Sequence, residues 1–298
     1  MEARHRAVMP NGSTATRELS ANGFRFTVDL AGDASAPLVL LLHGFPQTRY
    51  TWRHQLPALA TAGYRAVAPD QRGYSPGARP SGALHYGVDA LVGDALALAD
   101  ALGAERFHLV GHDWGGQLAW LLAARHPERV RTLSVLSRPH PAAFARALAS
   151  DPQQSERSKH HRAFQDPNTA SLLIEDGARR LRQLLREQGV ADADANAYIA
   201  SLSSHEAIDA ALNWYRAAFG GASALAAAGV PSVRVPTLFL WGDADATVGR
   251  PAADATREFV ASAYRFVVVP GAGHFLTDQA PAVVTKELLA HLASQAAA

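Results

Sequence analysis

Cysteine is missing from all 298 residues of the sequence. Its absence excludes a disulfide framework, a thiolate metal site and a cysteine nucleophile, and it fits a reducing compartment such as the cytoplasm. Lysine is scarce as well, because Lys159 and Lys286 stand against 26 arginines. Together with the abundant alanine, this bias is typical of a GC-rich bacterial genome.

The chain also lacks an excess of either charge and any long apolar run. Lysine and arginine number 28 and aspartate and glutamate 27, so the formal net charge is +1. Without a strong field of one sign, neither nucleic acid nor an anionic membrane surface is expected as a partner. The strongest apolar run, Leu38–Leu42, is far shorter than the roughly 20 residues of a membrane helix. Residues 1–20 contain no apolar stretch of the kind that a secretory signal needs.

Apolar residues are plentiful enough to build a large core, since they make up 48% of the chain against 18% charged residues. Short apolar runs predict seven strands, at residues 23–30, 37–42, 64–69, 106–110, 131–136, 237–241 and 264–269. Helical patterns alternate with them at residues 88–102, 117–125, 251–261 and 282–293. This alternation predicts an α/β fold whose mostly parallel sheet has helices on both faces.

One long stretch interrupts the alternation. No strand pattern is present between about Arg138 and Gly229. Five segments there have helical patterns, at residues 141–149, 155–164, 169–187, 191–202 and 205–217. Long insertions in α/β domains are usually lids or binding elements. We therefore predict a core domain of residues 1–137 and 230–298 and an all-helical lid domain of residues 138–229.

The strongest chemical signal is the pentapeptide Gly111-His112-Asp113-Trp114-Gly115, which follows a predicted strand and precedes a predicted helix. It matches the G-x-nucleophile-x-G elbow, a sharp turn whose small residues let the chain bend and lift the central side chain above the sheet. Asp113 stands here where the usual nucleophile is serine. An ordinary strand-to-helix turn with an N-capping aspartate has the same local sequence pattern. Other segments of the chain are therefore needed to distinguish a nucleophile from a capping residue.

Three other segments follow predicted strands and carry the residues that such a nucleophile needs. Leu42-His43-Gly44-Phe45-Pro46 comes after an early buried strand, and Gly242-Asp243-Ala244-Asp245 comes after a later one. A glycine-rich loop presents His274. The chain order is nucleophile Asp113, acid Asp245 and base His274, with Asp243 as the less favoured acid. The segment Ser137–His140, after another strand, offers no carboxylate.

With these motifs the chain resembles the epoxide hydrolase group of the α/β-hydrolases, in which nucleophile, acid and histidine have this order. The similarity extends from about Gly23 to Leu292. The segments that carry it are His43–Pro46, Trp52–Pro57, Asp70–Tyr74, Gly111–Gly116, Asn213–Tyr215 and Gly273–Phe275. The resemblance implies the α/β-hydrolase fold with an inserted helical lid, and a hydrolase that works without a cofactor.

An aspartate nucleophile suits attack on a saturated carbon that bears a leaving group, because the product is an alkyl ester of the enzyme. The carboxylate is already ionised near neutral pH and needs no base for this step. Water activated by His274 would then cleave the Asp113 ester, with Asp245 orienting the imidazole. The N–H groups of Phe45 and Trp114 would hold the oxyanion. Epoxides and alkyl halides both fit this chemistry.

An epoxide also needs a proton donor for its oxygen, and in the epoxide hydrolase family two lid tyrosines supply it. Tyr215, in Asn213-Trp214-Tyr215, matches the second of them. At the first position the sequence departs from the family pattern, because alignment places His160 there, with His161 as the neighbouring alternative. An imidazole can donate a hydrogen bond, so a pair of His160 and Tyr215 is the hypothesis. A solvated polar helix face is the competing interpretation of His160.

Aromatic residues near these motifs predict a cavity for an apolar or aromatic epoxide. The candidates for its walls are Phe45, Trp114, Phe164, Trp214 and Phe275, with His43 as a further substrate contact. The alternative activities are a haloalkane or haloacid dehalogenase on the same triad and, in another class, a non-catalytic binding protein on the hydrolase fold. A homodimer is one of the oligomeric states left open.

No metal or cofactor is expected. The remaining histidines, such as His54, His126, His140 and His205, show no metal-ligand spacing with one another. Neither the G-x-x-x-x-G-K-[ST] phosphate loop nor the dinucleotide-binding G-x-G-x-x-G motif occurs in the sequence.

Overall fold

A single eight-stranded sheet organises the protein. The computed structural model describes residues 13–219 and 230–296. The strand order is β1-β2-β4-β3-β5-β6-β7-β8, with β1 and β2 antiparallel to their neighbours and the other pairs parallel. The strands are β1 (Thr14–Ala21), β2 (Phe24–Ala31), β3 (Leu38–Leu42), β4 (Arg65–Pro69), β5 (Phe107–His112), β6 (Val130–Leu136), β7 (Thr237–Gly242) and β8 (Tyr264–Val269).

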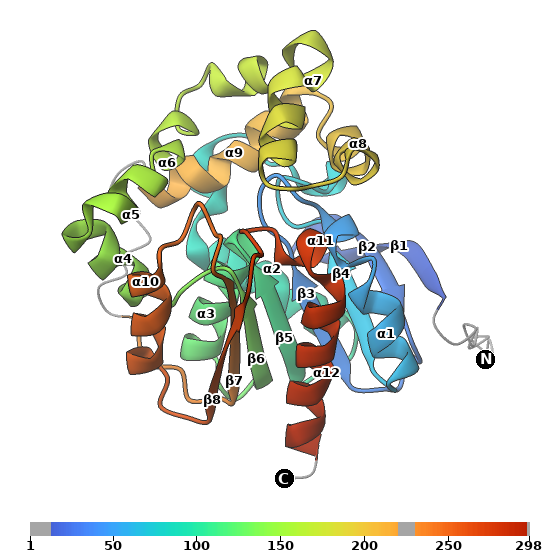
Figure 1. Cartoon of the computed structure of the whole chain (residues 1–298). Helices are drawn as coiled ribbons and strands as arrows, with labels where there is room; N and C mark the ends of the chain where they lie inside the picture. The colour runs from blue at the N-terminus through green and yellow to red at the C-terminus, as the bar shows by residue number, and fades with distance from the viewer. Residues whose placement is uncertain (1–12, 220–229, 297–298) are drawn as a thin grey trace, which may run out of the picture.

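Helices cover both faces of the sheet (Figure 1). One apolar layer joins the sheet to α2 (Val88–Ala101), α3 (Trp114–Arg125) and α10 (Arg250–Ala255). The other joins it to α1 (Gln55–Thr61), α11 (Leu276–Gln279) and α12 (Pro281–Ala296). Along β3, alternate residues belong to opposite layers, so that Leu40 packs in the first and Leu41 in the second. Burial on both faces explains why the central strands are continuous apolar runs.

All seven predicted strands are present within a residue or two of their predicted ends. Strand β1 was not predicted, because this edge strand is mostly exposed and its sequence TATRELSA contains few apolar residues. The short helix α1 was not predicted either. Edge strands and short helices bury one narrow face, so their apolar pattern is weak.

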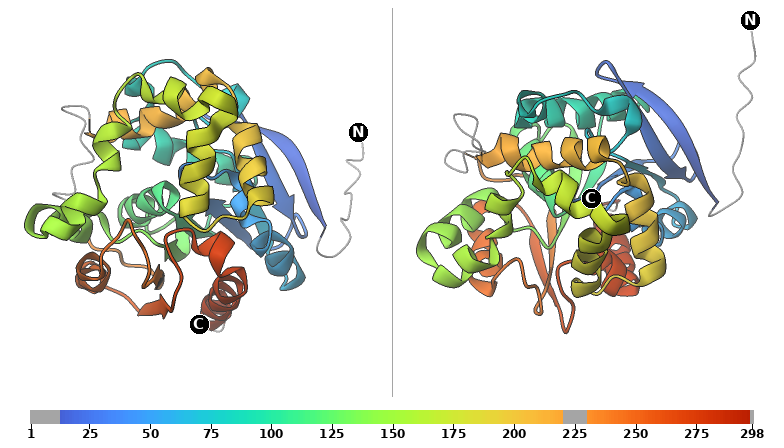
Figure 2. Two further views of the ribbon diagram at one scale, coloured as in Figure 1. Left: turned by 45° about the horizontal axis from the view of Figure 1, so that its top comes forward. Right: turned by 90° about the horizontal axis from the view of Figure 1, so that it is seen from above.

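In the described residues between β6 and β7 there are six helices, and Figure 1 shows them above the end of the sheet where the parallel strands finish. The view from above in Figure 2 shows them spread across that end. We refer to them as the α4–α9 segment. They are α4 (Pro141–Ser150), α5 (Pro152–Arg157), α6 (His160–Ala163), α7 (Thr169–Glu187), α8 (Asp192–Ser201) and α9 (His205–Phe219).

The segment differs from the predicted lid in two details. The helix expected over residues 155–164 is divided between α5 and α6, and α7 is interrupted at Glu175–Ala178, where three residues have positive φ. Residues 220–229 of the predicted lid lie outside the described residues. The division into core and lid domains stays a prediction. In the part of the chain that the structure describes, no helix is long and apolar enough to cross a membrane.

Candidate active site

Asp113 sits at the turn between β5 and α3. Its backbone has φ 52° and ψ −116°, a conformation that non-glycine residues rarely adopt. A strained residue of this kind persists only where the surrounding structure holds it, and such residues gather at functional sites. The turn lifts the carboxylate away from the sheet, which is the geometry of a nucleophile elbow.

Glycines make this turn possible, because backbone segments approach one another too closely for any side chain. A Cβ atom on Gly115 would lie 2.2 Å from the carbonyl oxygen of Leu42, and one on Gly111 would lie 2.3 Å from that of Gly115. On the neighbouring loop, a Cβ atom on Gly44 would lie 2.2 Å from Asp113 Oδ1. The elbow and the loop after β3 are therefore packed directly against each other.

The two oxygens of Asp113 have different surroundings. Oδ1 accepts a hydrogen bond of 2.9 Å from the backbone N–H of Phe45, the residue predicted to supply an oxyanion-hole donor. Oδ2 lies 3.4 Å from His274 Nε2. The backbone donor thus holds one oxygen and leaves the other directed toward the histidine. The second predicted donor is the backbone N–H of Trp114, which is the first residue of helix α3.

His274 is linked on its other side to Asp245. The distance between His274 Nδ1 and Asp245 Oδ2 is 2.8 Å, and both side chains are almost fully buried. Asp245 Oδ1 accepts hydrogen bonds from the backbone N–H groups of Thr247 and Val248, which fix its orientation. Asp243 is exposed and accepts instead from the N–H of Gly271. The structure therefore brings Asp113, His274 and Asp245 together in one chain of contacts.

Charge pairing dominates the protonation of this group. Burial alone lowers the pKa of His274, but the Asp245 and Asp113 carboxylates outweigh burial and raise it to about 10. Burial alone raises the pKa of Asp113, whereas the hydrogen bond and charge of His274 bring it below its ordinary value. At neutral pH Asp113 is consequently an anion next to an imidazolium.

Tyr215 reaches this site from α9 and is 3% exposed. Its ring contacts those of Trp114 and Phe164, with centroids 4.9 Å away in each case, and that of Phe45 at 5.7 Å. Burial and the negative charge of Asp113 hold the pKa of the Tyr215 hydroxyl well above its ordinary value. The hydroxyl therefore stays protonated at neutral pH and can donate a hydrogen bond.

His160 stands beside Tyr215, but its ring is arranged as an acceptor. Its Nδ1 lies 3.1 Å from the carbonyl oxygen of Arg157, which can only accept, so Nδ1 carries the proton of the neutral ring. Burial lowers the pKa of His160 to about 4. At neutral pH its Nε2 is therefore a lone-pair acceptor, and His160 meets the predicted donor role only as an imidazolium.

His161, the alternative to His160, is a packing residue. Its ring is stacked on Phe219 with centroids 4.7 Å apart, and burial lowers its pKa to about 2. It does not line the cavity above Asp113. Of the two neighbouring histidines, the structure thus directs His160 toward the site.

A cavity of about 140 Å³ opens above Asp113, His274 and Tyr215. For comparison, an apolar cavity of about 150 Å³ in another protein accommodates benzene. The apolar part of its wall is formed by Phe45, Pro46, Phe164, Leu184 and Phe275, and the polar part by His160, Gln188 and Thr247. Three of the predicted wall residues, Phe45, Phe164 and Phe275, are among them.

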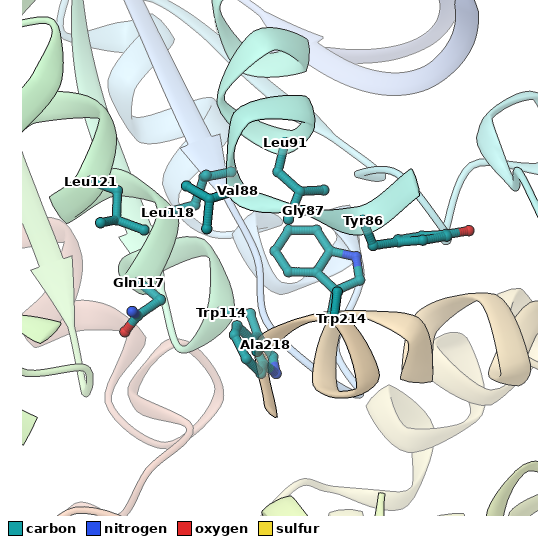
Figure 3. A pocket seen from close by; sticks show the side chains of 11 residues that line it. Tyr86, Gly87, Val88, Leu91, Trp114, Gln117, Leu118, Leu121, Trp214 and Ala218 are labelled. Atoms are coloured by element: carbon teal, nitrogen blue, oxygen red, sulfur yellow. The ribbon is translucent and has the colours of Figure 1, made fainter. Parts of the chain in front are cut away.

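Three predicted substrate contacts, Trp114, Trp214 and His43, lie elsewhere. Trp214 faces a second, smaller cavity of about 20 Å³ between α2, α3 and α9, which Trp114 also lines (Figure 3). The indole N–H of Trp214 donates to the carbonyl oxygen of Arg72, at 2.8 Å. His43 is fully buried, and its Nε2 accepts from the N–H of Gln71. The side chains of Trp214 and His43 hold loops together, and none of the three residues lines the cavity above Asp113.

Comparisons with known proteins show the family. The family described as alpha/beta hydrolase fold matches residues 37–281. Epoxide hydrolase A of Mycobacterium tuberculosis is 35% identical, over 94% of this chain and 98% of the relative. The crystal structure of epoxide hydrolase A from Mycobacterium thermoresistibile is 30% identical, with a TM-score of 0.81, and covers 94% of this chain and 98% of its own.

The chain belongs to the epoxide hydrolase group of the α/β-hydrolases. A third relative is a variant of the Bacillus megaterium epoxide hydrolase, solved in complex with its product (R)-3-[1]naphthyloxy-propane-1,2-diol. It is 27% identical with a TM-score of 0.84, over 93% of this chain and 99% of its own. The eight-stranded, mostly parallel sheet described above is thus the α/β-hydrolase fold that the sequence predicted.

Sequence reasoning missed several residues of this epoxide hydrolase site. Leu184 and Gln188 reach the cavity from the end of α7, where an apolar helix face has the same pattern whether it packs on a core or lines a cavity. Thr247 could have been found from the sequence, because it lies only two residues after Asp245, the predicted acid of the site. The buried Arg138, whose charge helps to lower the pKa of Asp113, gave no motif signal.

Proposed function

We propose that the protein hydrolyses an epoxide to a vicinal diol through an ester formed on Asp113. The single observation that carries this proposal is the arrangement of Asp113. Its carboxylate lies on a nucleophile elbow, with one oxygen bound by the Phe45 N–H and the other directed at His274. An ionised carboxylate in this position is suited to attack a saturated carbon.

In the first step Asp113 Oδ2 attacks an epoxide carbon, because Oδ1 is held by Phe45. The electron pair of the broken carbon–oxygen bond moves to the epoxide oxygen, which takes a proton from the Tyr215 hydroxyl. His274 is an imidazolium at this stage and can return a proton to Tyr215. The products of the step are an alkyl ester on Asp113, a substrate hydroxyl and a neutral His274.

Esterification itself prepares the second step. When Asp113 loses its negative charge, one of the two carboxylates that raise the pKa of His274 is gone, and the ring can act as a base. Neutral His274 then removes a proton from water, which attacks Cγ of Asp113, while Asp245 stabilises the imidazolium. The charge develops on Oδ1, where the Phe45 N–H already lies, with the Trp114 N–H as the second proposed donor. Cleavage of the Cγ–Oδ2 bond then releases the diol, whose leaving oxygen takes a proton from the His274 imidazolium. Asp113 is left as a carboxylic acid and returns its proton to His274, which restores the starting ion pair.

The α4–α9 segment is proposed to act as the lid of this site. It supplies Tyr215, His160, Phe164, Leu184 and Gln188 to the cavity. The aromatic walls favour a compact apolar or aryl-substituted epoxide, in keeping with the naphthyloxy diol bound to the Bacillus megaterium relative. A cytoplasmic location and a homodimer stay predictions.

A single turnover in H₂¹⁸O tests the proposed function. With enzyme in excess over an aryl glycidyl ether, we expect the first diol to carry no heavy oxygen, because its new oxygen comes from Asp113. Mass spectrometry of the diol and of the peptide containing Asp113 measures both positions. Heavy oxygen in the first diol would contradict the ester route.

The variant Asp113→Asn is the matched control, and we expect it to form neither ester nor diol. A panel of haloalkanes, assayed for chloride release, distinguishes the dehalogenase alternative on the same triad. Chloride release without epoxide opening would replace the proposal by that alternative. Binding of epoxides without turnover of either class would favour the non-catalytic binding protein.

A further inference from the structure

The loop that presents His274 is tied to the α4–α9 segment by one side chain, that of Gln279. Its Oε1 accepts a hydrogen bond of 2.6 Å from the N–H of Gly273, the residue before His274. Its Nε2 donates to the carbonyl oxygen of Gln188, at the end of α7. The two partners fix the orientation of the amide, since one is a donor and the other an acceptor.

Two glycines lie close to this amide. A Cβ atom on Gly273 or on Gly189 would lie 3.0 Å from Gln279 Nε2. Gly189 also has φ +74°, a conformation that favours glycine. The backbone of the His274 loop and the backbone after α7 therefore both lie close to Gln279. A side chain at either glycine would crowd the Gln279 amide.

The neighbouring residue, Asp278, adds a second link between the same parts. It accepts hydrogen bonds from the Tyr198 hydroxyl of α8, at 2.9 and 3.0 Å, and pairs with Arg53 at 2.8 Å. Arg53 also pairs with Asp194 of α8. The short helix α11 thus contacts the ends of both α7 and α8 immediately after the catalytic histidine.

The His274 loop has a separate anchor on the core. His112 Nε2 donates a hydrogen bond of 2.8 Å to the carbonyl oxygen of His274. Gln279 therefore binds the loop at the N–H of Gly273, the residue before the histidine. His112 binds it at the carbonyl oxygen of His274. His112 belongs to the elbow of the core, whereas the Gln279 link depends on the end of α7.

We propose that Gln279 is a positioning residue for ester hydrolysis. Its bond to the Gly273 N–H holds the His274 loop for that step, and its bond to the Gln188 carbonyl joins the loop to the end of α7. The proposal rests on the function proposed above, in which His274 acts as a base only in the second step. Misplacing the histidine should therefore slow ester breakdown more than ester formation. Because Gln188 and Leu184 line the cavity, the same link should also influence substrate binding.

Three variants separate these effects. Q279L removes both hydrogen bonds at similar volume. Q279E keeps an acceptor for the Gly273 N–H but places an oxygen against the Gln188 carbonyl, so only the link to α7 is lost. Q55L is the matched control, because Gln55 also joins two elements, through Pro281 and Thr285, and is buried away from the site.

Rapid-quench mass spectrometry of the Asp113 ester measures formation and breakdown separately. For Q279L we expect breakdown to slow at least tenfold while formation stays within threefold, so that ester accumulates. For Q279E we expect breakdown within threefold of wild type and a raised KM. Q55L should lower the melting temperature and leave both rates unchanged.

Unchanged ester breakdown in Q279L would overturn the proposal, as would a Q279E variant as slow as Q279L. The NMR signals of the His274 ring provide a second readout without substrate, and we expect them to shift in Q279L but not in Q55L. If the wild type forms no ester at all, the proposed function fails, and the NMR comparison still decides whether Gln279 positions His274. Unshifted His274 signals in Q279L would then overturn the positioning role.

Discussion

Tyr215 and His160 face the same cavity with opposite hydrogen-bonding capacities. The tyrosine hydroxyl is protonated and can donate, whereas neutral His160 has already used its proton on the Arg157 carbonyl. The pair therefore differs from the two tyrosines of the family pattern, because only one of its members, Tyr215, is a donor at neutral pH. The histidine contributes an acceptor and an edge-on aromatic contact with Phe164.

This difference predicts unequal effects of two substitutions to phenylalanine. Tyr215→Phe should slow formation of the Asp113 ester by about 10²- to 10⁴-fold, the usual contribution of a positioned proton donor. His160→Phe should change it by less than tenfold at pH 7. Rapid-quench measurement of ester formation checks both rates. Equal losses in the two variants would mean that His160 donates to the epoxide as well.

At the scale of elements, the site depends on how closely α3, β3 and the loop after β3 approach one another. Gly115, the second residue of α3, lies directly against the carbonyl oxygen of Leu42. This contact places the start of α3, and with it Asp113, beside the loop that carries Phe45. The distance between a strand end and a helix start thus sets the geometry of the nucleophile.

Two glycine-to-alanine variants test the importance of this approach. Gly115→Ala must displace backbone, and overpacking of this kind costs about 1–3 kcal/mol or more, so we expect lower stability and strongly reduced activity. Gly93→Ala lies inside α2, where the nearest atom to a Cβ is 3.5 Å away. It should stabilise the protein by about 0.5–1 kcal/mol, because alanine favours helix. Urea unfolding and epoxide turnover measure both effects.

Across the whole molecule, several buried histidines make stability depend on pH. Burial lowers the pKa of His108, His112 and His140 to about 4 in each case. Their unfolded pKa is about 6.5. The unfolded chain therefore binds more protons than the folded protein between these values, and stability falls as the pH drops from about 6.5 to about 4. His274, with its raised pKa, acts in the opposite direction, and its contribution is lost as the pH rises toward 10.

We therefore expect the free energy of unfolding to decrease from pH 7 to pH 5. Each histidine whose pKa is lowered contributes a slope of up to about 1.4 kcal/mol per pH unit. His108→Gln, at the end of the sheet away from the elbow, should flatten this dependence by about one such contribution. Urea unfolding at several pH values measures the slope. A stability that is constant between pH 5 and 7 would contradict the assignment of these histidines as neutral.

The positions of seven strands along the chain, the elbow and the candidate triad residues could be predicted from the sequence, because each depends on a short local pattern. Buried strands are apolar runs, and an elbow needs small residues on both sides of its nucleophile. The helical content of residues 138–219 was predictable for the same reason. Strand β1 was not, since its exposed side chains carry no apolar signal.

Only the tertiary structure decided which side chains from distant segments share the cavity and what each can do there. Trp214 and Tyr215 are neighbours in one motif, yet the turn of α9 directs one to Arg72 and the other to Asp113. The tautomer of His160 depends on a carbonyl oxygen three residues earlier, and the role of Gln279 depends on the end of a helix 91 residues away. The sequence by itself determined the chemistry available at each position, because residue type sets charge and reactivity. Packing decided which groups meet, because contacts between distant segments leave no local pattern in the chain.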